Sequence, residues 1–221
     1  GLGGRLPTQG TVGSGADIAS GGIVRDTGST TFPVDTHAGG FSSSGTTFDS
    51  SAFSTTATTG LLVVVATLGN PNGTNMGVPT LAGQGTISGL TFTKRVEGDP
   101  ETLHSHLAQI WTAPFSSAIS GGTVRLSWTT ADTSSYVVGL LVDAITGVDT
   151  VGVSNVVNNT TTASCEVSLT GVASGSWSYV GAMEEGGNTA FTPNGSTTER
   201  QDFYSGAAAA VMAGTSTATG N

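Results

Sequence analysis

The most apolar run of the chain, residues 60–68, limits what the chain can fold into. Its sequence, GLLVVVATL, is rich in β-branched residues, and a turn of Gly, Asn and Pro follows it. The run is too short to span a membrane, so it predicts a buried β-strand. Residues 61–66 are all apolar, so both faces of this strand must be covered. One cover can be a sandwich core, and the other must be a loop, an N-terminal arm or a neighbouring subunit.

The composition favours an all-β fold, which we expect to be a two-sheet antiparallel sandwich. Gly accounts for 34 of the 221 residues and charged residues for 10%, and no long window carries helix formers at helical spacing. A second apolar run, 136–145, is expected beside the first. Residues 39–40 and 69–85 are expected to be turns. The predicted strands are 31–35, 46–49, 61–68, 89–96, 107–113, 123–128, 136–145, 151–157, 163–169, 177–183, 197–203 and 207–212.

The chain divides into an extended arm or linker, residues 1–30, and a β-sandwich domain, residues 31–221. No hydrophobic period is sustained in the arm, which we expect to order against another surface. Within the domain, the segment Thr93-Lys94-Arg95 and the strand after it have counterparts in Thr198-Glu199-Arg200 and 207–213. This weak repeat lacks a counterpart of strand 136–145. We expect the missing strand to come from a neighbour's arm or from residues after 221.

The charge balance argues against nucleic acid as a partner. Fifteen acidic residues oppose six basic ones, which gives a net charge of −9. Cys165 is the only cysteine, so an internal disulfide is excluded, and we expect this residue to be a small buried hydrophobe. Residues 1–4 have neither the basic start nor the apolar stretch of a signal peptide.

One group of residues is a candidate metal site. Asp99, Glu101, His104 and His106 lie close together, and His-x-His spacing places both imidazoles on one face of a strand. The interpretation that we favour is a polar loop leading into strand 107–113. Calcium could bind at Asp132, Asp143 and Asp149, but these acids lack the spacing of a known calcium loop. We predict neither a metal nor another cofactor.

The remaining motifs do not predict catalysis. The Gly-x-Ser-x-Gly elbow, a recognisable Ser/His/acid grouping and a phosphate-binding glycine loop are all absent from the sequence. Trp111, Trp128 and Trp177 could stack on a sugar, but each lies in an apolar strand, where packing in the core is the expected use.

Several segments together resemble a known family. Residues 61–68, 89–95 (GLTFTKR), 110–114 (IWTAP), 122–126 (GTVRL), 137–149 and 197–200 (TTER) look like a β-sandwich domain of bacteriophage tail, fibre and capsid-accessory proteins and of some bacterial surface proteins. The resemblance covers roughly residues 45–220. It implies a jelly-roll-like fold, a place on the outside of a virion or cell, and one apolar strand more than this chain contains.

The expected function is therefore that of a non-enzymatic structural protein of a virion exterior. Its expected partners are further copies of itself or other virion proteins, and neither nucleic acid nor a membrane. The alternative is a cell-surface adhesion module that binds a glycan through loops 69–85 and 186–197. Both loops are rich in Asn and Gly.

Overall fold

The structure is a computed structural model of the chain. It describes residues 10–11, 19–26, 34–42, 45–69, 75–98, 106–129, 137–157, 164–165, 176–185, 197–205 and 209–217. Apart from one 3-10 helix, η1 (Gly85–Ile87), the regular elements of these residues are β-strands. The pairs formed by these strands are antiparallel. The predicted all-β sandwich is therefore confirmed.

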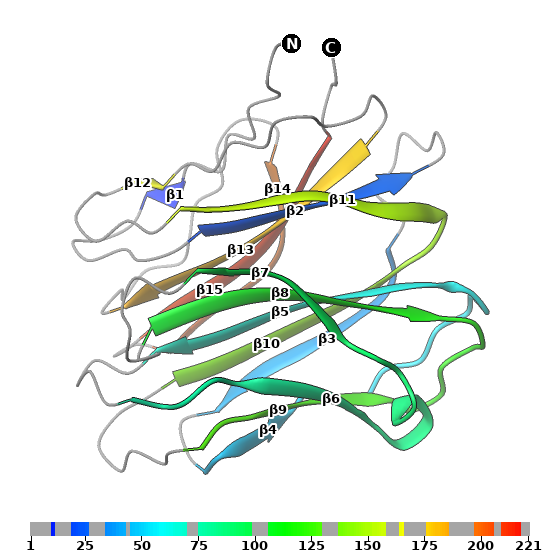
Figure 1. Ribbon diagram of the computed structural model, residues 1–221, viewed down its shortest axis with the longest axis horizontal. Helices are drawn as coiled ribbons and strands as arrows, with labels where there is room; N and C mark the ends of the chain where they lie inside the picture. The colour runs from blue at the N-terminus through cyan, green and yellow to red at the C-terminus, as the bar shows by residue number, and fades with distance from the viewer. Residues whose placement is uncertain are drawn as a thin grey trace.

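Residues 34–145 form a jelly roll of two sheets. The central sheet has the order β3-β10-β5-β8-β7, with β3 Val34–Ser42, β10 Val137–Ile145, β5 Gly60–Gly69, β8 His106–Phe115 and β7 Thr93–Gly98. The small sheet has the order β4-β9-β6, with β4 Thr47–Asp49, β9 Thr123–Ser127 and β6 Thr80–Gln84. Strands β3 to β6 alternate between the two sheets, and β9 and β10 insert between earlier strands (Figure 1). This winding is that of a jelly roll.

A further sheet, called here the second sheet, packs on the other face of the central sheet. Its order is β11-β2-β13-β15-β14, with β11 Val148–Val157, β2 Ala19–Asp26, β13 Ser176–Glu185, β15 Ala209–Thr217 and β14 Thr197–Ser205. Strand β13 contacts β5 and β8, and β11 contacts β7. A short pair joins β1 (Gly10–Thr11) to β12 (Ser164–Cys165). The central sheet is thus the middle layer of three.

Strand β5 is buried on both faces because it lies inside this middle layer. Successive side chains of a strand point to opposite faces. Leu62, Val64, Ala66 and Leu68 join a core with the small sheet, whereas Leu61, Val63 and Val65 join a core with Tyr179 of β13. Each of these β5 residues is at most 6% exposed. The prediction that both faces are covered is confirmed, and the two covers are sheets of the same chain.

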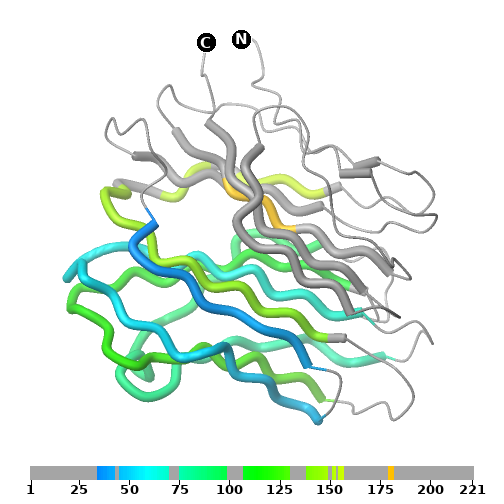
Figure 2. The backbone as a smooth tube through the Cα atoms, turned by 180° about the vertical axis from the view of Figure 1, so that it is seen from behind, coloured from blue at the N-terminus to red at the C-terminus, as the bar shows by residue number. Residues whose placement is uncertain are grey.

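The central strands were predictable from their apolar character. Strand β10 pairs with β5 without interruption from Val137 opposite Gly69 to Ile145 opposite Leu61, as expected for the two apolar runs (Figure 2). In β9 the predicted alternation is confirmed, because Val124 and Leu126 are fully buried whereas Arg125 between them is partly exposed.

Two predicted turns are wrong. Gly39 and Gly40 lie inside β3, opposite Leu141 and Leu140, and not between two strands. Gly40 has a φ of 150°, which side chains rarely adopt, and a Cβ there would come 2.8 Å from Cζ of Phe48, so the backbone and the ring both favour glycine at this place. Within the predicted turn 69–85, residues 80–84 form β6, a short edge strand that the sequence does not reveal because it has one large apolar residue, Leu81, and lacks apolar alternation.

The predicted strand 89–96 begins later than expected. Strand β7 starts at Thr93, while residues 85–92 form η1 and an irregular segment. Leu90 and Phe92 nevertheless pack against the core between the central and small sheets, as their apolar character predicted. Packing rather than strand pairing holds this segment.

Part of the expected N-terminal arm belongs to the second sheet. Residues 19–26 form β2, which pairs with β11 on one side and with β13 on the other. These residues therefore pair within their own chain and do not remain a separate arm. This strand could not be predicted from the sequence, because its only large apolar residues are Ile23 and Val24 and they form no periodic pattern. Backbone hydrogen bonds on both sides hold the strand, and they do not depend on side chains.

Candidate functional site

The candidate metal site is not tested by the described part of the chain, which contains only one of its four residues. Asp99, Glu101 and His104 lie outside the described residues. The backbone of His106 starts β8 opposite Gly69. Within the described ranges no group of three or more His, Cys, Asp or Glu side chains could hold a metal ion.

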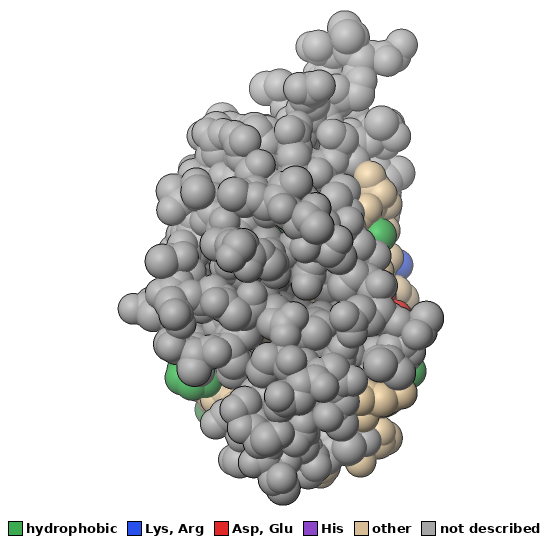
Figure 3. Space-filling model, turned by 90° about the vertical axis from the view of Figure 1, so that its left-hand side faces the viewer, with side chains coloured by type: hydrophobic (Ala, Val, Ile, Leu, Met, Phe, Trp, Pro, Cys, Tyr) green, Lys and Arg blue, Asp and Glu red, His purple; other side chains and the backbone are tan. Residues whose placement is uncertain are grey.

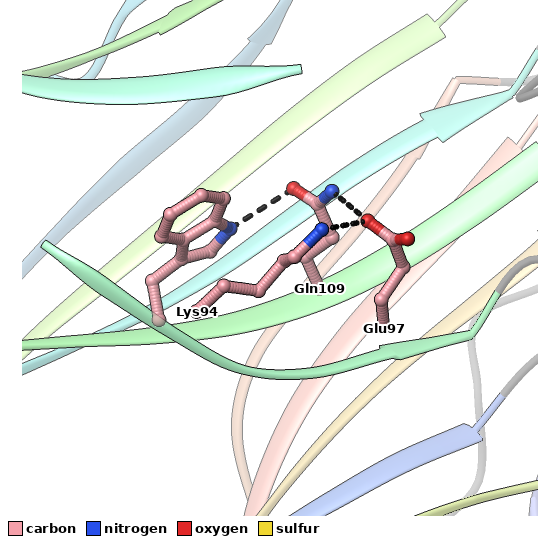
Figure 4. Close-up of polar contacts among 4 residues, drawn as sticks. Lys94, Glu97 and Gln109 are labelled. Atoms are coloured by element: carbon pink, nitrogen blue, oxygen red, sulfur yellow. Dashed lines mark hydrogen bonds and ion pairs between the residues drawn. The ribbon is translucent and has the colours of Figure 1, made fainter. Parts of the chain in front are cut away.

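A polar cluster around Trp111 is the candidate site of the described surface. It consists of Lys94 and Glu97 from β7 and of Gln109 and Trp111 from β8, and we call it the Trp111 cluster (Figure 4). Gln109 and Trp111 are two residues apart and so share one face of β8. The β7–β8 register places Glu97 opposite Gln109 and Lys94 opposite Trp111.

A β-bulge brings Lys94 and Glu97 to the same face. Residues three apart in a regular strand point to opposite faces, but the register shifts between Lys94 and Val96. The extra residue is Arg95. Its Nε donates to Oγ1 of Thr112 at 2.7 Å, and its carbonyl oxygen accepts from Oγ of Ser154 at 2.9 Å. The bulge thus builds the Trp111 cluster on one face and connects β7 to β11 on the other.

Hydrogen bonds link the members of the Trp111 cluster into one network. Nε2 of Gln109 donates to Oε2 of Glu97 at 2.5 Å, and Nζ of Lys94 lies 2.6 Å from the same oxygen. Nε1 of Trp111 donates to Oε1 of Gln109 at 2.9 Å. The ammonium of Lys94 lies 5.8 Å from the centre of the Trp111 ring, a cation–π distance. The buried Gln109 amide is thereby satisfied at both ends.

The side chains of this network are suited to holding β7 and β8 together. Glu97 already receives an ammonium and an amide, and the cluster contains neither a nucleophile nor a second carboxylate for acid–base catalysis. Trp111 is half-buried against the core, and Trp128 is 4% exposed within it. The expectation that tryptophans serve packing is confirmed for these two, while the side chain of Trp177 lies outside the described residues.

A buried polar pair joins the central and second sheets. Tyr179 donates its hydroxyl hydrogen to Oδ2 of Asp143 at 2.5 Å, and both residues are at most 2% exposed. Asp143 was a candidate calcium ligand at a loop rim. It lies instead in the middle layer, opposite Val63 of β5, because β10 is a central strand. Asp132 and the side chain of Asp149 lie outside the described residues.

Two partly exposed carboxylates have lowered pKa values. Arg125 donates to both oxygens of Asp49 at 2.6 Å across the β4–β9 pair, and these hydrogen bonds lower the pKa of Asp49. The pKa of Asp35 is lowered by the hydroxyl of Thr56 and by the backbone N–H groups of Ala57 and Thr56. Both carboxylates connect strands or loops of the fold.

No family model, curated protein or solved structure matches the chain. The described residues include no helix of the length and hydrophobicity needed to cross a membrane. Among the residues whose side chains the structure describes, Phe41 and Val78 are the large hydrophobic ones more than a third exposed, so the others are mostly internal. The hydrophobic side chains that Figure 3 colours appear as small separate areas near the margin of the view. Function is therefore inferred from the geometry of the chain itself.

Sequence reasoning missed Glu97, Gln109 and the Asp143–Tyr179 pair. Gln109 gave one usable signal, because an amide at an inward position of the apolar strand 107–113 needs buried partners. The position of Glu97 depends on the bulge at Arg95, and the Asp143–Tyr179 pair depends on how two sheets stack. Neither a β-bulge nor the stacking of two sheets produces a recognisable pattern in the local sequence.

Proposed function

We propose that the chain is a non-enzymatic structural protein of a virion exterior, a tail, fibre or capsid-accessory subunit that assembles through packing and strand pairing. The observation that carries the proposal is that, among the described residues, the central, small and second sheets do not close into barrels and each ends in two outermost strands. Their outermost strands are β3 and β7, β4 and β6, and β11 and β14. An outermost strand is where a strand of another chain can add to a sheet.

Two further points support the proposal. Jelly-roll sheets are common in viral capsid proteins, although a fold alone does not assign a function. The resemblance of residues 45–220 to bacteriophage tail, fibre and capsid-accessory domains points to the same role. The apolar faces of β5 no longer contribute to it, because both faces are covered within the chain.

The described carboxylates also favour a non-enzymatic role. Glu97 is bonded to Lys94 and Gln109, and Asp143 to Tyr179. A general acid or base must reach a proton on its substrate. These groups instead hold neighbouring strands or sheets together, as expected of a building block.

Immunogold electron microscopy tests the virion role. An antibody raised against the purified chain is expected to label the outer surface of intact particles from the source material. Peptides of the chain should also occur in the mass spectra of those particles. Particles that lack both the label and the peptides would contradict the proposal.

The competing function is adhesion to a cell-surface glycan. The observation in its favour is that the Trp111 cluster places an aromatic ring beside a partly exposed ammonium and carboxylate, groups that also occur in sugar sites. A glycan array with purified protein separates the two functions. Reproducible binding that is lost in Trp111→Ala and kept in Val78→Ala, a change of an exposed side chain, would favour adhesion.

A further inference from the structure

The second sheet repeats the strand order of the central sheet. The central order is β3-β10-β5-β8-β7, and the second order is β11-β2-β13-β15-β14. Position by position, β11 corresponds to β3, β13 to β5, β15 to β8 and β14 to β7. These strands also follow one another along the chain in the same sequence. Strand β2 alone breaks the rule, because it precedes all the others and occupies the place of β10.

A bulge at the same place supports this correspondence. In β7 the register shifts between Lys94 and Val96, and in β14 it shifts between Glu199 and Gln201. The residue passed over is Arg95 in one strand and Arg200 in the other. These arginines end the similar segments Thr93-Lys94-Arg95 and Thr198-Glu199-Arg200. Sequence similarity, strand order and an irregularity of pairing therefore agree.

The short pair β1–β12 extends the correspondence to the small sheet. In residues 34–145, β4 follows β3 and pairs with β9, which precedes β10. In the same way, β12 follows β11 and pairs with β1, which precedes β2. Strands β1 and β2 thus take the places of β9 and β10. The strand that the second half of the sequence lacks is supplied by residues 19–26.

We propose that β1 and β2 (Gly10–Thr11 and Ala19–Asp26) form an exchangeable closing segment: they complete a second jelly-roll unit formed by β11 to β15, and a second copy of this chain can supply the same strands to the same place. The partner is therefore identical in sequence. Exchange keeps every backbone pair of β2, because the strand taken up equals the strand released. The inference goes beyond the proposed function and does not depend on a virion.

The pairing of β2 is less regular than that of β10, which favours exchange. Strand β10 forms nine consecutive residue pairs with β5, whereas β2 forms seven with β13. On its other side β10 forms eight pairs with β3 and has one register shift, whereas β2 forms six with β11 and has two. A strand with fewer and interrupted pairs opens at a lower free-energy cost. The closing segment is thus the replaceable part of the second sheet.

Disulfide trapping in the full-length chain tests the exchange. Ile23 of β2 lies opposite Ser178 of β13. Directly opposite residues of antiparallel strands have Cα atoms about 4.5–5.5 Å apart, within the range that a disulfide bridges. One variant carries Ile23→Cys and the other Ser178→Cys, both with Cys165→Ser so that the native thiol does not react.

Mixing the two variants and oxidising them should give a covalent dimer linked between positions 23 and 178, identified by peptide mapping. The matched control mixes the Ile23→Cys variant with a Val78→Cys variant. Val78 is exposed and lies outside the second sheet, so this mixture reports chance collisions. We expect severalfold more dimer in the first mixture than in the control.

A chain that carries both Ile23→Cys and Ser178→Cys completes the test. When dilute, it should form the link within one molecule, and the locked chain should then lose the ability to form linked dimers. Equal dimer yields in both mixtures would overturn the exchange, and failure to form the internal link would overturn the closing role of β2 as well. Ala19→Cys with Ala182→Cys, a directly opposite pair four residues further along the two strands, repeats the test if the first variants do not fold. Particle labelling by antibody is a separate measurement, so failure of either proposal is recognised independently.

Discussion

Gly181→Ala is the sharpest test of how the second sheet packs on the central sheet. Gly181 is a buried residue of β13, and a Cβ at this position would lie 2.5 Å from Cγ1 and 3.1 Å from Cγ2 of Val65. Val65 is fully buried in β5, in the middle layer, so it has little room to move. The added methyl group therefore forces the two sheets apart or distorts the Val65 rotamer.

The packing of β13 on β5 determines whether Gly181→Ala lowers or raises the unfolding free energy. Overpacking of this kind costs about 1–3 kcal/mol of unfolding free energy. If the face of β13 were open, the same change would instead stabilise the protein by roughly 0.5–1 kcal/mol, because glycine loses more backbone entropy than alanine on folding. Val65→Ala alone should cost about 2–3 kcal/mol through lost burial and a cavity. In the double variant the new methyl group occupies part of that cavity, so the combined loss should fall short of the sum by about 1–2 kcal/mol.

The wild type, the two single variants and the double variant are compared by urea unfolding at pH 7, followed by tryptophan fluorescence. Linear extrapolation to zero urea gives the unfolding free energy of each protein. Gly89→Ala is the control, because a Cβ at Gly89 meets no atom within 4 Å. It should change stability by no more than about 0.5 kcal/mol. A stabilising Gly181→Ala, or additive losses in the double variant, would refute the packing of β13 on β5.

Three other substitutions test local features of the fold. Tyr179→Phe should cost about 1–3 kcal/mol in urea unfolding because it leaves the buried carboxylate of Asp143 without the hydroxyl donor, and a neutral result would contradict the sheet-joining role of the pair. Asp49→Asn should lower stability at pH 7. In the folded state Arg125 lowers the pKa of Asp49 from its ordinary value of 3.8. The extra stability of the wild type over the variant is therefore present above pH 3.8 and lost as the pH falls through the folded pKa. A difference between the melting temperatures of wild type and variant that does not change with pH would contradict the ion pair. Gly60→Ala should cost about 1–3 kcal/mol because its methyl group would meet the carbonyl oxygen of Ile145 and the Phe115 ring, and unchanged thermal unfolding would contradict this close approach.

The fold class and the central strands follow from local sequence. A run such as 61–66, apolar at every position, has no low-energy exposed face, so it must be the interior strand of a layered structure. Alternation in 123–128 likewise assigns Val124 and Leu126 to the core before any contact is known. The repeat of Thr-Lys-Arg as Thr-Glu-Arg also predicted that the second half lacks one strand.

The identity of the covers could not be predicted in this way. The apolar character of Val63 and Val65 indicates that they must be covered by another surface. Because the hydrophobic effect is not directional, it does not determine which surface covers them. The chain satisfies the need with its own second sheet, and β2 enters that sheet through backbone hydrogen bonds, which any residue except proline can make on both sides.

The same division holds for the polar groups. The amide of Gln109 in an apolar strand indicates that a buried hydrogen-bonded network exists, because an unsatisfied buried amide is costly. The members of this network are decided by the extra residue Arg95, which turns Glu97 toward Gln109. The separate Asp143–Tyr179 pair is decided by the stacking of the second sheet on the central sheet. Local sequence thus specifies which groups must be buried and bonded, whereas the partners are chosen only when distant strands acquire their register, since register is a property of two strands together.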